Sequence, residues 1–522
     1  MKKKIIALAL FIVMLLSLLA GCGGGGGGGG SNTGNNTSGG STGDLDYVEM
    51  TWLFIGDPPG DAQMVQDAIN EKLMEKLNCR INIQMTSWTD WDTRLRNELI
   101  AGNVDVCYTA SWLNYVIYAN EGAFMALDDI LPSAAPDLYN ALEPQLNMMK
   151  VKGQYYALPN LWPEYVTLGI MYREDLRKKL NLPVPNSMEN METYLLGIQQ
   201  YDPEQTLISY GPQPPTTIQN YFRAFDHLNM KYNWISLGYG LWYDNDNPSK
   251  TVDYWYSQDF IDDCKLMKKW ADLGFWSRSA LSDTNLPEFV LETGLSVATW
   301  TNPNRFTEAI ARVERDYPDW EVGFFAFGEC NGGGIWPAHA RQNATAIAST
   351  CKNPERALQA VEYIMLDEEM HNLFHYGIEG LHYEVRDGNY YSLSPVGATE
   401  PFKYEGFNSW NLRNGEFKIP LSTDKILLDT WDRLDAIAAK AKYPRVNIPD
   451  GFQEDYSGYE AERIAVINVM VEYLAPIQAG LVNDVEASIA DFLRRAEAAG
   501  LQKCRESYDR QFKEYLAEFG YE

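Results

Sequence analysis

The chain has 522 residues, of which 71 are acidic and 43 basic, so its formal net charge is −28. A nucleic-acid partner requires a basic footprint, and this acidic composition excludes one. Hydrophobic residues make up 45% and aromatic residues 13% of the chain. These values indicate a globular body long enough for two or more domains.

Residues 1–21 are predicted to be a secretion signal. Three lysines precede an apolar run, Ile5–Ala20, which is shorter than the about 20 apolar residues that a membrane span needs. The run ends in Leu19-Ala20-Gly21-Cys22, which resembles the lipobox of bacterial lipoproteins. The resemblance implies cleavage before Cys22 and lipidation of that cysteine, palmitate included. An ordinary signal with a chance cysteine is the alternative.

A linker follows the lipidated cysteine within residues 22–43. Residues 23–43 are only Gly, Ser, Asn and Thr, so they cannot bury enough apolar surface to fold and should behave as a flexible coil. The typical reach of such a coil is about 25 Å. Signal, anchor and linker together predict a folded body tethered to the cell membrane on its extracytoplasmic face.

The body is predicted to begin with a strand, a helix and a second strand. Val48–Asp57 is a nearly continuous apolar run, typical of a strand buried on both faces. Asp61 is placed to cap the helix that follows, in which apolar residues recur at helical spacing: Val65, Ile69, Leu73 and Leu77. Strand signals return at residues 79–87.

The alternation continues with a second helix and a third strand. The helix is expected over Asp90–Ala101, stopped by Gly102, with three residues facing inward: Leu95, Leu99 and Ile100. Residues 104–109 then form the third strand. Strand–helix–strand–helix–strand at this spacing favours a parallel sheet with right-handed crossovers.

Ligands of such sheets collect at the carboxyl ends of the strands. Those ends are Gly56-Asp57, Ser87-Trp88 and Thr109–Trp112. Two of the three carry a tryptophan, whose ring can stack on the flat C–H face of a sugar. A single aromatic side chain is more often a core residue than a ligand contact, but several at strand ends favour a cleft lined by some of them.

Further elements are predicted along the rest of the chain. Strands are expected within Lys152–Tyr165, Val166–Leu176, Glu292–Phe306 and Arg341–Thr350. Helices are expected over Leu182–Gln199 with Ser187 as N-cap, over Pro354–Leu373, and from about Glu460 to the end. In the last region two groups recur at helical spacing: Ile464, Ile467, Val471 and Leu474, then Val482, Val485, Ile489 and Phe492. Pro476, between the groups, should kink or end the first helix.

One group of histidines could either bind a metal ion or pack the helix that carries them against its neighbours. His371 and His375 share a helix face, and Glu379 and His382 follow, so three histidines and a glutamate could bind zinc. The H-E-x-x-H arrangement is absent and Gly377 ends the helix, so helix packing is favoured and no metal is predicted.

The remaining cysteines have no metal-binding spacing. Most are expected to be buried free thiols, with one disulfide possible and its pairing open. They are Cys79, Cys107, Cys264, Cys330, Cys351 and Cys504.

No catalytic arrangement is visible. A glycoside hydrolase needs two carboxyl groups about 5–10 Å apart, and the acidic residues are so numerous that no pair stands out. Asp90 and Asp92 are better explained as a helix cap, and Asp128 and Asp129 as a solvated face. Nucleophile-elbow, P-loop and dinucleotide-binding fingerprints are absent. The chain is therefore predicted to be no enzyme and to need no cofactor.

Four stretches, in this order and together with the lipobox, resemble the bacterial extracellular solute-binding proteins of the maltose-binding-protein class, the lipoprotein receptors of sugar ABC transporters. The stretches are Ala101–Leu131, Lys152–Leu176, Gly294–Pro303 and Cys351–Glu384. The second resembles the family's "G-K-x-Y-A-x-P" stretch, with Gln154 in place of the lysine. The third resembles a strand that ends in a ligand-stacking tryptophan. The fourth resembles the "G-I-E-G-x-H-Y" turn of a long lipoprotein branch.

The resemblance covers residues 48–520 and implies an α/β fold, the two-lobed periplasmic-binding-protein-like fold (type II). Each lobe would be a mainly parallel sheet flanked by helices, with a hinge between the lobes and a helical C-terminal region. Lobe 1 would comprise residues 44–163 plus about 338–405, and lobe 2 residues 164–337 plus about 406–522. The chain departs from the maltose receptors in two inserts rich in Tyr, Trp and Asn, near Asp244–Trp255 and Gly388–Asn414.

The implied function is that of a monomeric receptor that binds a carbohydrate, an oligosaccharide by preference, between its lobes and delivers it to ABC permease subunits. A surface-anchored glycoside hydrolase and a receptor for peptides or other solutes are the alternatives. The candidate ligand-binding residues are Asp57, Trp88, Asp90, Ser111, Trp112, Asn114, Trp162, Glu164, Trp300, Asn302 and Trp336.

Overall fold

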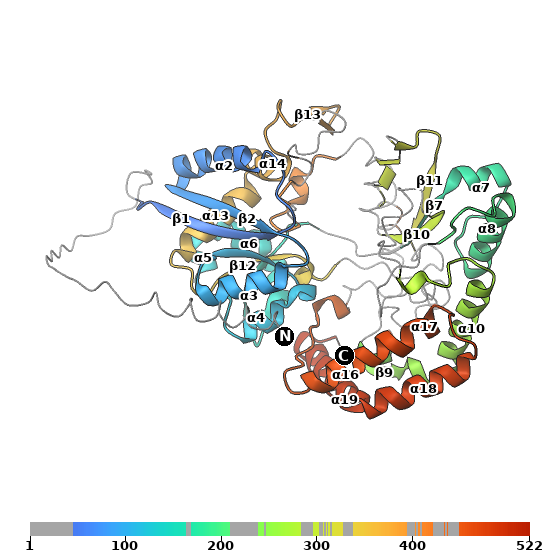
Figure 1. Ribbon diagram of the computed structural model, residues 1–522. Coiled ribbons are helices and arrows are strands. Elements are labelled where there is room, and N and C mark those ends of the chain that lie inside the picture. Colours follow the sequence, from blue (N-terminus) through green and yellow to red (C-terminus); the bar gives the residue numbers. More distant parts are fainter. Residues whose placement is uncertain are drawn as a thin grey trace, which may run out of the picture. The chain divides into compact units, whose positions relative to one another are not determined.

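A computed structural model (Figure 1) describes most of the body of the chain. The described ranges are residues 45–162, 169–208, 238–244, 247–282, 296–301, 316–326, 338–393, 410–420 and 448–521, with a few single positions between them. The predicted anchor Cys22 and three candidate site residues, Glu164, Asn302 and Trp336, lie outside the described residues.

The predicted strand–helix alternation at the start of the body is confirmed. The elements are β1 (Val48–Ile55), α2 (Ala62–Leu77), β2 (Cys79–Thr86), α3 (Trp91–Ala101) and β3 (Val106–Thr109). Strand β1 pairs in parallel with both β2 and β3. Since β2 and β3 lie on opposite sides of β1, right-handed crossovers place α2 and α3 on opposite faces of the sheet, as Figure 1 shows.

Two later strands complete the first sheet in the order β2-β1-β3-β12-β6. Strand β12 (Ala344–Ile347) is antiparallel to β3 on one side and to β6 (Ala157–Pro159) on the other. The core around this sheet also contains α13 (Pro354–Leu366) and α14 (Glu368–Tyr376), which divide the predicted helix Pro354–Leu373 in two. Shorter elements surround it: α4 (Tyr115–Asn120), α5 (Leu131–Ala134), α6 (Pro136–Leu146), β4 (Lys150–Val151), β5 (Gln154–Tyr155), β13 (Tyr383–Arg386) and β14 (Asn389–Ser392).

The second sheet differs from the expected parallel arrangement. Its described strands have the order β10-β7-β11, and β7 (Gly169–Arg173) is antiparallel to both β10 (Ala298–Thr301) and β11 (Val322–Ala326). The connection from β7 to β10 is far longer than one crossover helix, so it does not force a parallel return. It contains α7 (Glu174–Leu180), α8 (Met188–Tyr201), β8 (Leu241–Asp244), β9 (Asn247–Asp253) and α10 (Gln258–Asp272). Ser187 caps α8 as predicted, because its hydroxyl accepts from the Asn190 N–H.

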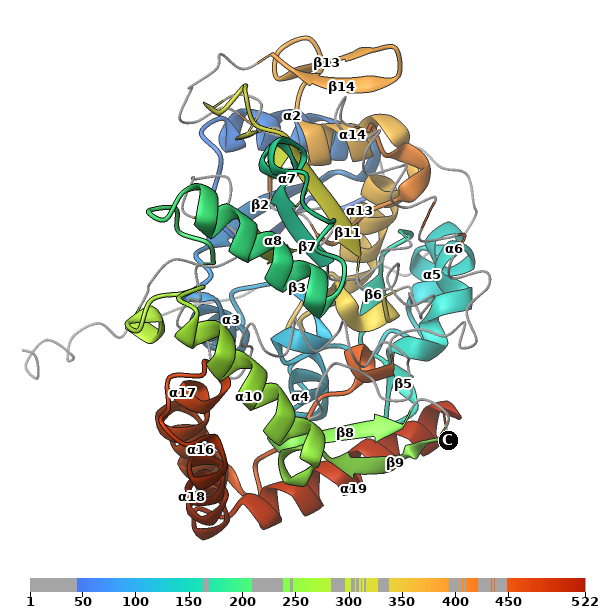
Figure 2. The same ribbon diagram turned by 90° about the vertical axis from the view of Figure 1, so that its right-hand side faces the viewer.

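The predicted helical C-terminal region is confirmed. It consists of α16 (Glu460–Val469), a π-helical turn (Met470–Leu474), α17 (Ala475–Gln478), α18 (Val485–Ala498) and α19 (Leu501–Phe519). The helix changes form just before Pro476, whose missing N–H and bulky ring disfavour a regular continuation. Figure 2 shows the β8–β9 hairpin along α19, so the first Tyr/Trp-rich insert belongs to the core of this region.

Exposure separates one residue predicted to face inward, and two from the apolar series of the C-terminal region, from the core. Ile100 is 78% exposed, Ile464 51% and Val471 50%. Ile100 follows the buried Leu99 by one residue, a rotation of about 100° around the helix, which turns it away from the sheet. In α16 and the π-helical turn the buried positions are Val466, Met470 and Leu474, of which only Leu474 belongs to the predicted series. In α18 three residues of the predicted series are buried, namely Val485, Ile489 and Phe492.

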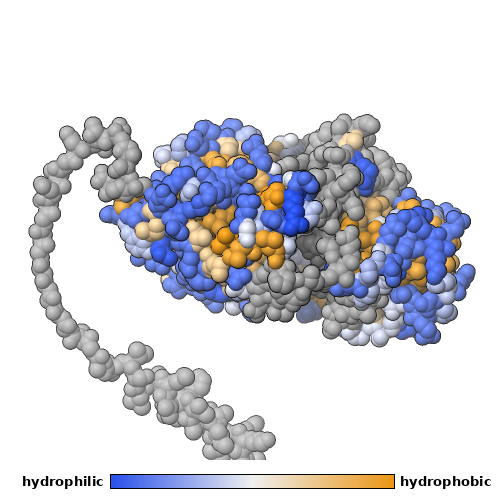
Figure 3. Space-filling view, turned by 90° about the horizontal axis from the view of Figure 1, so that it is seen from above, coloured by the Kyte–Doolittle hydropathy of each residue, from blue (hydrophilic) through white to orange (hydrophobic). Residues whose placement is uncertain are grey.

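On the face seen in Figure 3, the coloured residues are mostly hydrophilic, with hydrophobic residues gathered in patches. Five of the six cysteines of the body are buried and form no disulfide within the described residues, as predicted: Cys79, Cys107, Cys264, Cys351 and Cys504. Cys330 lies outside the described residues. None of the described helices is both long and apolar enough to span a membrane.

Candidate functional site

Two of the tryptophans predicted at strand ends come together in space. Because β2 and β3 both run parallel to β1, their carboxyl ends meet at one edge of the sheet. Trp88 follows β2, and Trp112 lies in a 3₁₀ turn, Ser111–Leu113, that follows β3. Their rings are stacked, with centroids 5.9 Å apart and planes 15° from parallel. The two side chains are 47% and 43% exposed.

A third ring, Trp410, joins this pair. Its centroid lies 5.2 Å from that of Trp88 and 6.1 Å from that of Trp112. The buried Asn160 holds Trp410 in place, since its amide donates to the Trp410 carbonyl at 2.7 Å. We call Trp88, Trp112 and Trp410 the tryptophan cluster. Sequence analysis missed Trp410, although the aromatic content of the Gly388–Asn414 insert was the signal that could have found it.

The ring of Trp112 is held by its polar edge. The indole N–H donates to the Gln342 carbonyl at 2.8 Å. Tyr108 contacts the ring edge-on at 6.2 Å, and its hydroxyl donates to Asn343 Oδ1 at 2.5 Å. Residues 342 and 343 precede β12, so the strand that returns from the later half of the chain orients this indole. The hydrogen bond fixes the edge and leaves part of the ring open to solvent.

Polar candidates follow the same strand ends, because β1 ends beside β2 in the sheet. Asp57 is exposed after β1, and Asp90 is exposed two residues beyond Trp88, where it accepts from the Ser87 hydroxyl at 2.8 Å. Asn114 has a left-handed backbone (φ 64°) and donates to Asp92 at 2.8 Å. Ser111, in contrast, is buried. The strand ends thus offer carboxylates and an amide beside exposed indoles, the combination that ring hydroxyls and C–H faces of a sugar require.

Trp162 follows β6, whose carboxyl end reaches the same edge of the first sheet, because β6 and β3 are both antiparallel to β12. Trp162 contacts Lys418, whose ammonium nitrogen lies 4.6 Å from the ring centroid. Trp300 lies in β10 opposite Ile170 of β7, and therefore in a different sheet from the tryptophan cluster.

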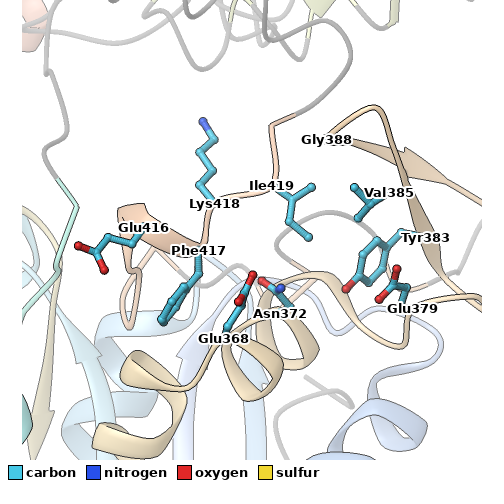
Figure 4. A pocket seen from close by; sticks show the side chains of 10 residues that line it. All are labelled: Glu368, Asn372, Glu379, Tyr383, Val385, Gly388, Glu416, Phe417, Lys418 and Ile419. Carbon is cyan, nitrogen blue, oxygen red and sulfur yellow. The ribbon is translucent and has the colours of Figure 1, made fainter.

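A pocket of about 310 Å³ lies between α14, the β13–β14 hairpin and residues 416–419 (Figure 4). Its walls combine three carboxylates with two aromatic rings, and Figure 4 shows Lys418 directed away from the other side chains. The lining residues are Glu368, Asn372, Glu379, Tyr383, Val385, Gly388, Glu416, Phe417, Lys418 and Ile419. Its acceptors suit hydroxyl or ammonium groups. Sequence analysis named Glu379 here only as a weak metal candidate.

The histidines pack the segment that carries Trp410 onto α14. His371 Nε2 accepts from the Asn414 N–H at 3.2 Å, and His375 Nε2 donates to the Leu412 carbonyl at 3.1 Å. Burial lowers the pKa of His371 to about 4 and that of His375 well below its usual value, so both rings are neutral near pH 7. Within the described residues, no group of three or more His, Cys, Asp or Glu side chains could hold a metal ion.

Comparison with known proteins gives matches along most of the chain. Residues 449–517 match a family described as a domain of unknown function, DUF3502. A carbohydrate ABC transporter substrate-binding protein of Streptococcus pneumoniae is 22% identical over 480 residues, which cover 88% of this chain and 90% of that protein.

Solved structures with the same fold are also found. The N-glycan transport solute-binding protein of Streptococcus pneumoniae has a TM-score of 0.73 at 18% identity, covering 90% of this chain and 99% of that one. An HMO-binding, ABC-transporter-associated solute-binding protein of Bifidobacterium longum infantis has a TM-score of 0.64 at 14% identity, covering 90% and 99%. The resemblance stated from the sequence and the solute-binding-protein fold are thus confirmed.

Proposed function

We propose that this protein is a receptor of an ABC importer that binds an oligosaccharide on the tryptophan cluster and delivers it to the permease. The observation that carries the proposal is the group of indoles, two of them nearly half exposed, at the carboxyl ends of β2 and β3. The similar proteins support the ligand class, since one is named for carbohydrate, one for N-glycan and one for HMO.

Sugar binding follows from the chemistry of this edge. The C–H face of a sugar ring is flat and apolar, so it can stack on an indole, while its hydroxyls need polar partners. Asp57 and Asp90, which are exposed at the ends of β1 and β2, provide such partners. No bond of the ligand is broken in this mechanism. The receptor signals occupancy by closing around the ligand, because contacts to both lobes stabilise the closed state over the open one.

A sugar panel tests the proposal against its enzymatic rival. Calorimetry and thermal melting with neutral oligosaccharides should give saturable binding and a higher melting temperature. An assay for new reducing ends in the same samples should stay at background. Release of product would favour the glycoside hydrolase, and binding of peptides without any sugar would favour the peptide receptor.

We further propose that Cys22 anchors the protein to the extracytoplasmic face of the membrane, on the basis of the lipobox and the linker of residues 23–43. Cys22→Ser should release a folded protein into the medium, whereas the wild type should partition with membranes and into the detergent phase. The melting curve of the released protein serves as the control for folding. A variant that still partitions into detergent would show that the anchor lies elsewhere.

A further inference from the structure

Helix α4 depends for its start on a residue that lies far away in the sequence. The first N–H groups of a helix have no partner within the helix. The residue before α4, Asn114, is in the left-handed region and makes no side-chain cap. The N–H of Val116 is instead accepted by the side-chain oxygen of Gln453 at 2.8 Å. A side chain from the C-terminal region therefore caps this helix.

That contact fixes a chain of hydrogen bonds. A backbone N–H can only donate, so the oxygen of Gln453 must face Val116 and its NH₂ group must donate to Asn114 Oδ1, 3.0 Å away. The NH₂ group of Asn114 then donates to Asp92 Oδ1 at 2.8 Å. Both amide orientations follow from one backbone donor, and together they hold the left-handed turn from two sides.

The same stretch of residues 448–453, which we call the strap, holds a second segment. The Gly451 carbonyl accepts from the buried Arg341 guanidinium at 2.6 Å. The next residue, Gln342, provides the carbonyl that binds the indole of Trp112. Trp112 itself lies two residues before Asn114. The strap thus forms hydrogen bonds with both segments that determine where this indole lies, the one that contains Asn114 and the one that contains Arg341.

We infer that the C-terminal region, of which residues 449–517 match a domain of unknown function, positions Trp112 for its ligand, and that Gln453 is the positioning residue. The inference rests on the proposed function only in taking the ligand to be a carbohydrate. Without Gln453, the Val116 N–H and Asn114 Oδ1 lose their partners. A left-handed backbone is uncommon for residues other than glycine, so the turn that carries Trp112 would then relax.

The first test needs no ligand. Protein labelled with 5-fluorotryptophan is studied by ¹⁹F NMR, and the Trp112 signal is assigned by its loss in Trp112→Phe. Gln453→Ala should shift or broaden that signal. Asn114→Gly, which removes the amide but tolerates the left-handed backbone, should do the same. Gln502→Ala is the matched control, because among the described residues the Gln502 side chain bonds only the exposed Glu506, one turn along α19. An unchanged Trp112 signal in folded Gln453→Ala would overturn the inference.

The second test is a double-mutant cycle on sugar affinity. Gln453→Ala should weaken binding about fivefold or more in the wild-type background and add no further loss in Trp112→Ala, because Gln453 acts through Trp112. Equal losses in both backgrounds would overturn the inference. If the wild type binds no sugar while the Trp112 signal still moves in Gln453→Ala, the proposed function fails and the positioning role stands.

Discussion

At the scale of single residues, the tryptophan cluster is the feature that the fold leaves open for a ligand. Large indoles usually bury most of their surface, and Trp52 and Trp270 do so here. Trp88 and Trp112 instead remain nearly half exposed, although Trp88 touches two other rings and Trp112 three. Since the indole N–H of Trp112 is already bonded, its ring is ordered before any ligand arrives, which lowers the entropic cost of stacking.

Replacing Trp112 by alanine should therefore weaken binding more than folding. The loss of one stacked ring costs about 1–3 kcal/mol, which corresponds to roughly 5- to 150-fold in affinity, with base stacking as the guide. Trp91→Ala is the matched control, since Trp91 is 2% exposed and its truncation should cost about 3–5 kcal/mol of stability. Calorimetry and melting curves separate the two effects. A Trp112→Ala protein that melts as early as Trp91→Ala but binds normally would make Trp112 a core residue.

At the scale of elements, the strap can follow its path only because residue 451 is a glycine. A Cβ at Gly451 would lie 2.3 Å from the Tyr515 hydroxyl and 2.5 Å from His339 Nε2. Both partners are buried, and the Tyr515 hydroxyl already donates to the Ile448 carbonyl at 2.8 Å. The helix that carries Tyr515 and the turn that carries His339 thus close on the strap from two sides.

Gly451→Ala should accordingly destabilise the protein by about 1–3 kcal/mol, the range for overpacking a well-filled site. Gly458→Ala is the control in the same region, because no atom of the described residues lies within 4 Å of its added Cβ. Chemical denaturation measures both variants. Equal stabilities would mean that the strap moves aside at little cost, and that its contacts with Arg341 and Tyr515 hold it only weakly.

Local sequence signals predicted the elements far better than the contacts between them. The run Val48–Asp57 and the spacing of Val65 and Ile69 each lie within one element, so β1 and α2 could be predicted. The meeting of Trp88 with Trp112 could also be foreseen, because parallel strands share one edge. The aromatic content of the Gly388–Asn414 insert could have marked Trp410 as a candidate, but not its place at this edge. The place of Gln453 could not be foreseen either, since both residues reach the edge from hundreds of residues away by a path that no local pattern encodes.

The second sheet also shows that local sequence patterns do not predict how distant elements are arranged. A parallel arrangement was expected for it by resemblance, whereas β7 is antiparallel to β10 and β11. The direction in which a strand returns depends on the whole long connection before it. The buried face of a helix is harder to predict than the helix itself but easier than a distant contact. Leu95 and Leu99 could be predicted to face inward, but Ile100 beside them is exposed.

At the scale of the whole molecule, the chain passes between its two sheets more than once. It leaves the first sheet after β6 for β7, and it returns after β11 to form β12. A few residues in such connections are enough to serve as hinges. Candidate ligand contacts belong to both sheets, the tryptophan cluster to the first and Trp300 to the second. A ligand that touched both would favour closure, because its contacts would be incomplete in the open state.

Closure should therefore be visible as compaction without chemistry. Residues Leu45–Glu522 form one compact unit, for which the expected radius of gyration is about 23 Å. Small-angle scattering of this chain with a saturating oligosaccharide should show a decrease of about an ångström or less. The control is Trp112→Ala at a sugar concentration too low to occupy this variant, and its radius of gyration should not decrease. This control distinguishes closure of the protein from a change in scattering contrast caused by the free sugar. A chelator should leave the compaction unchanged, because the proposed mechanism needs no metal. Binding without compaction would contradict the hinge, and loss of binding on chelation would contradict a metal-free site.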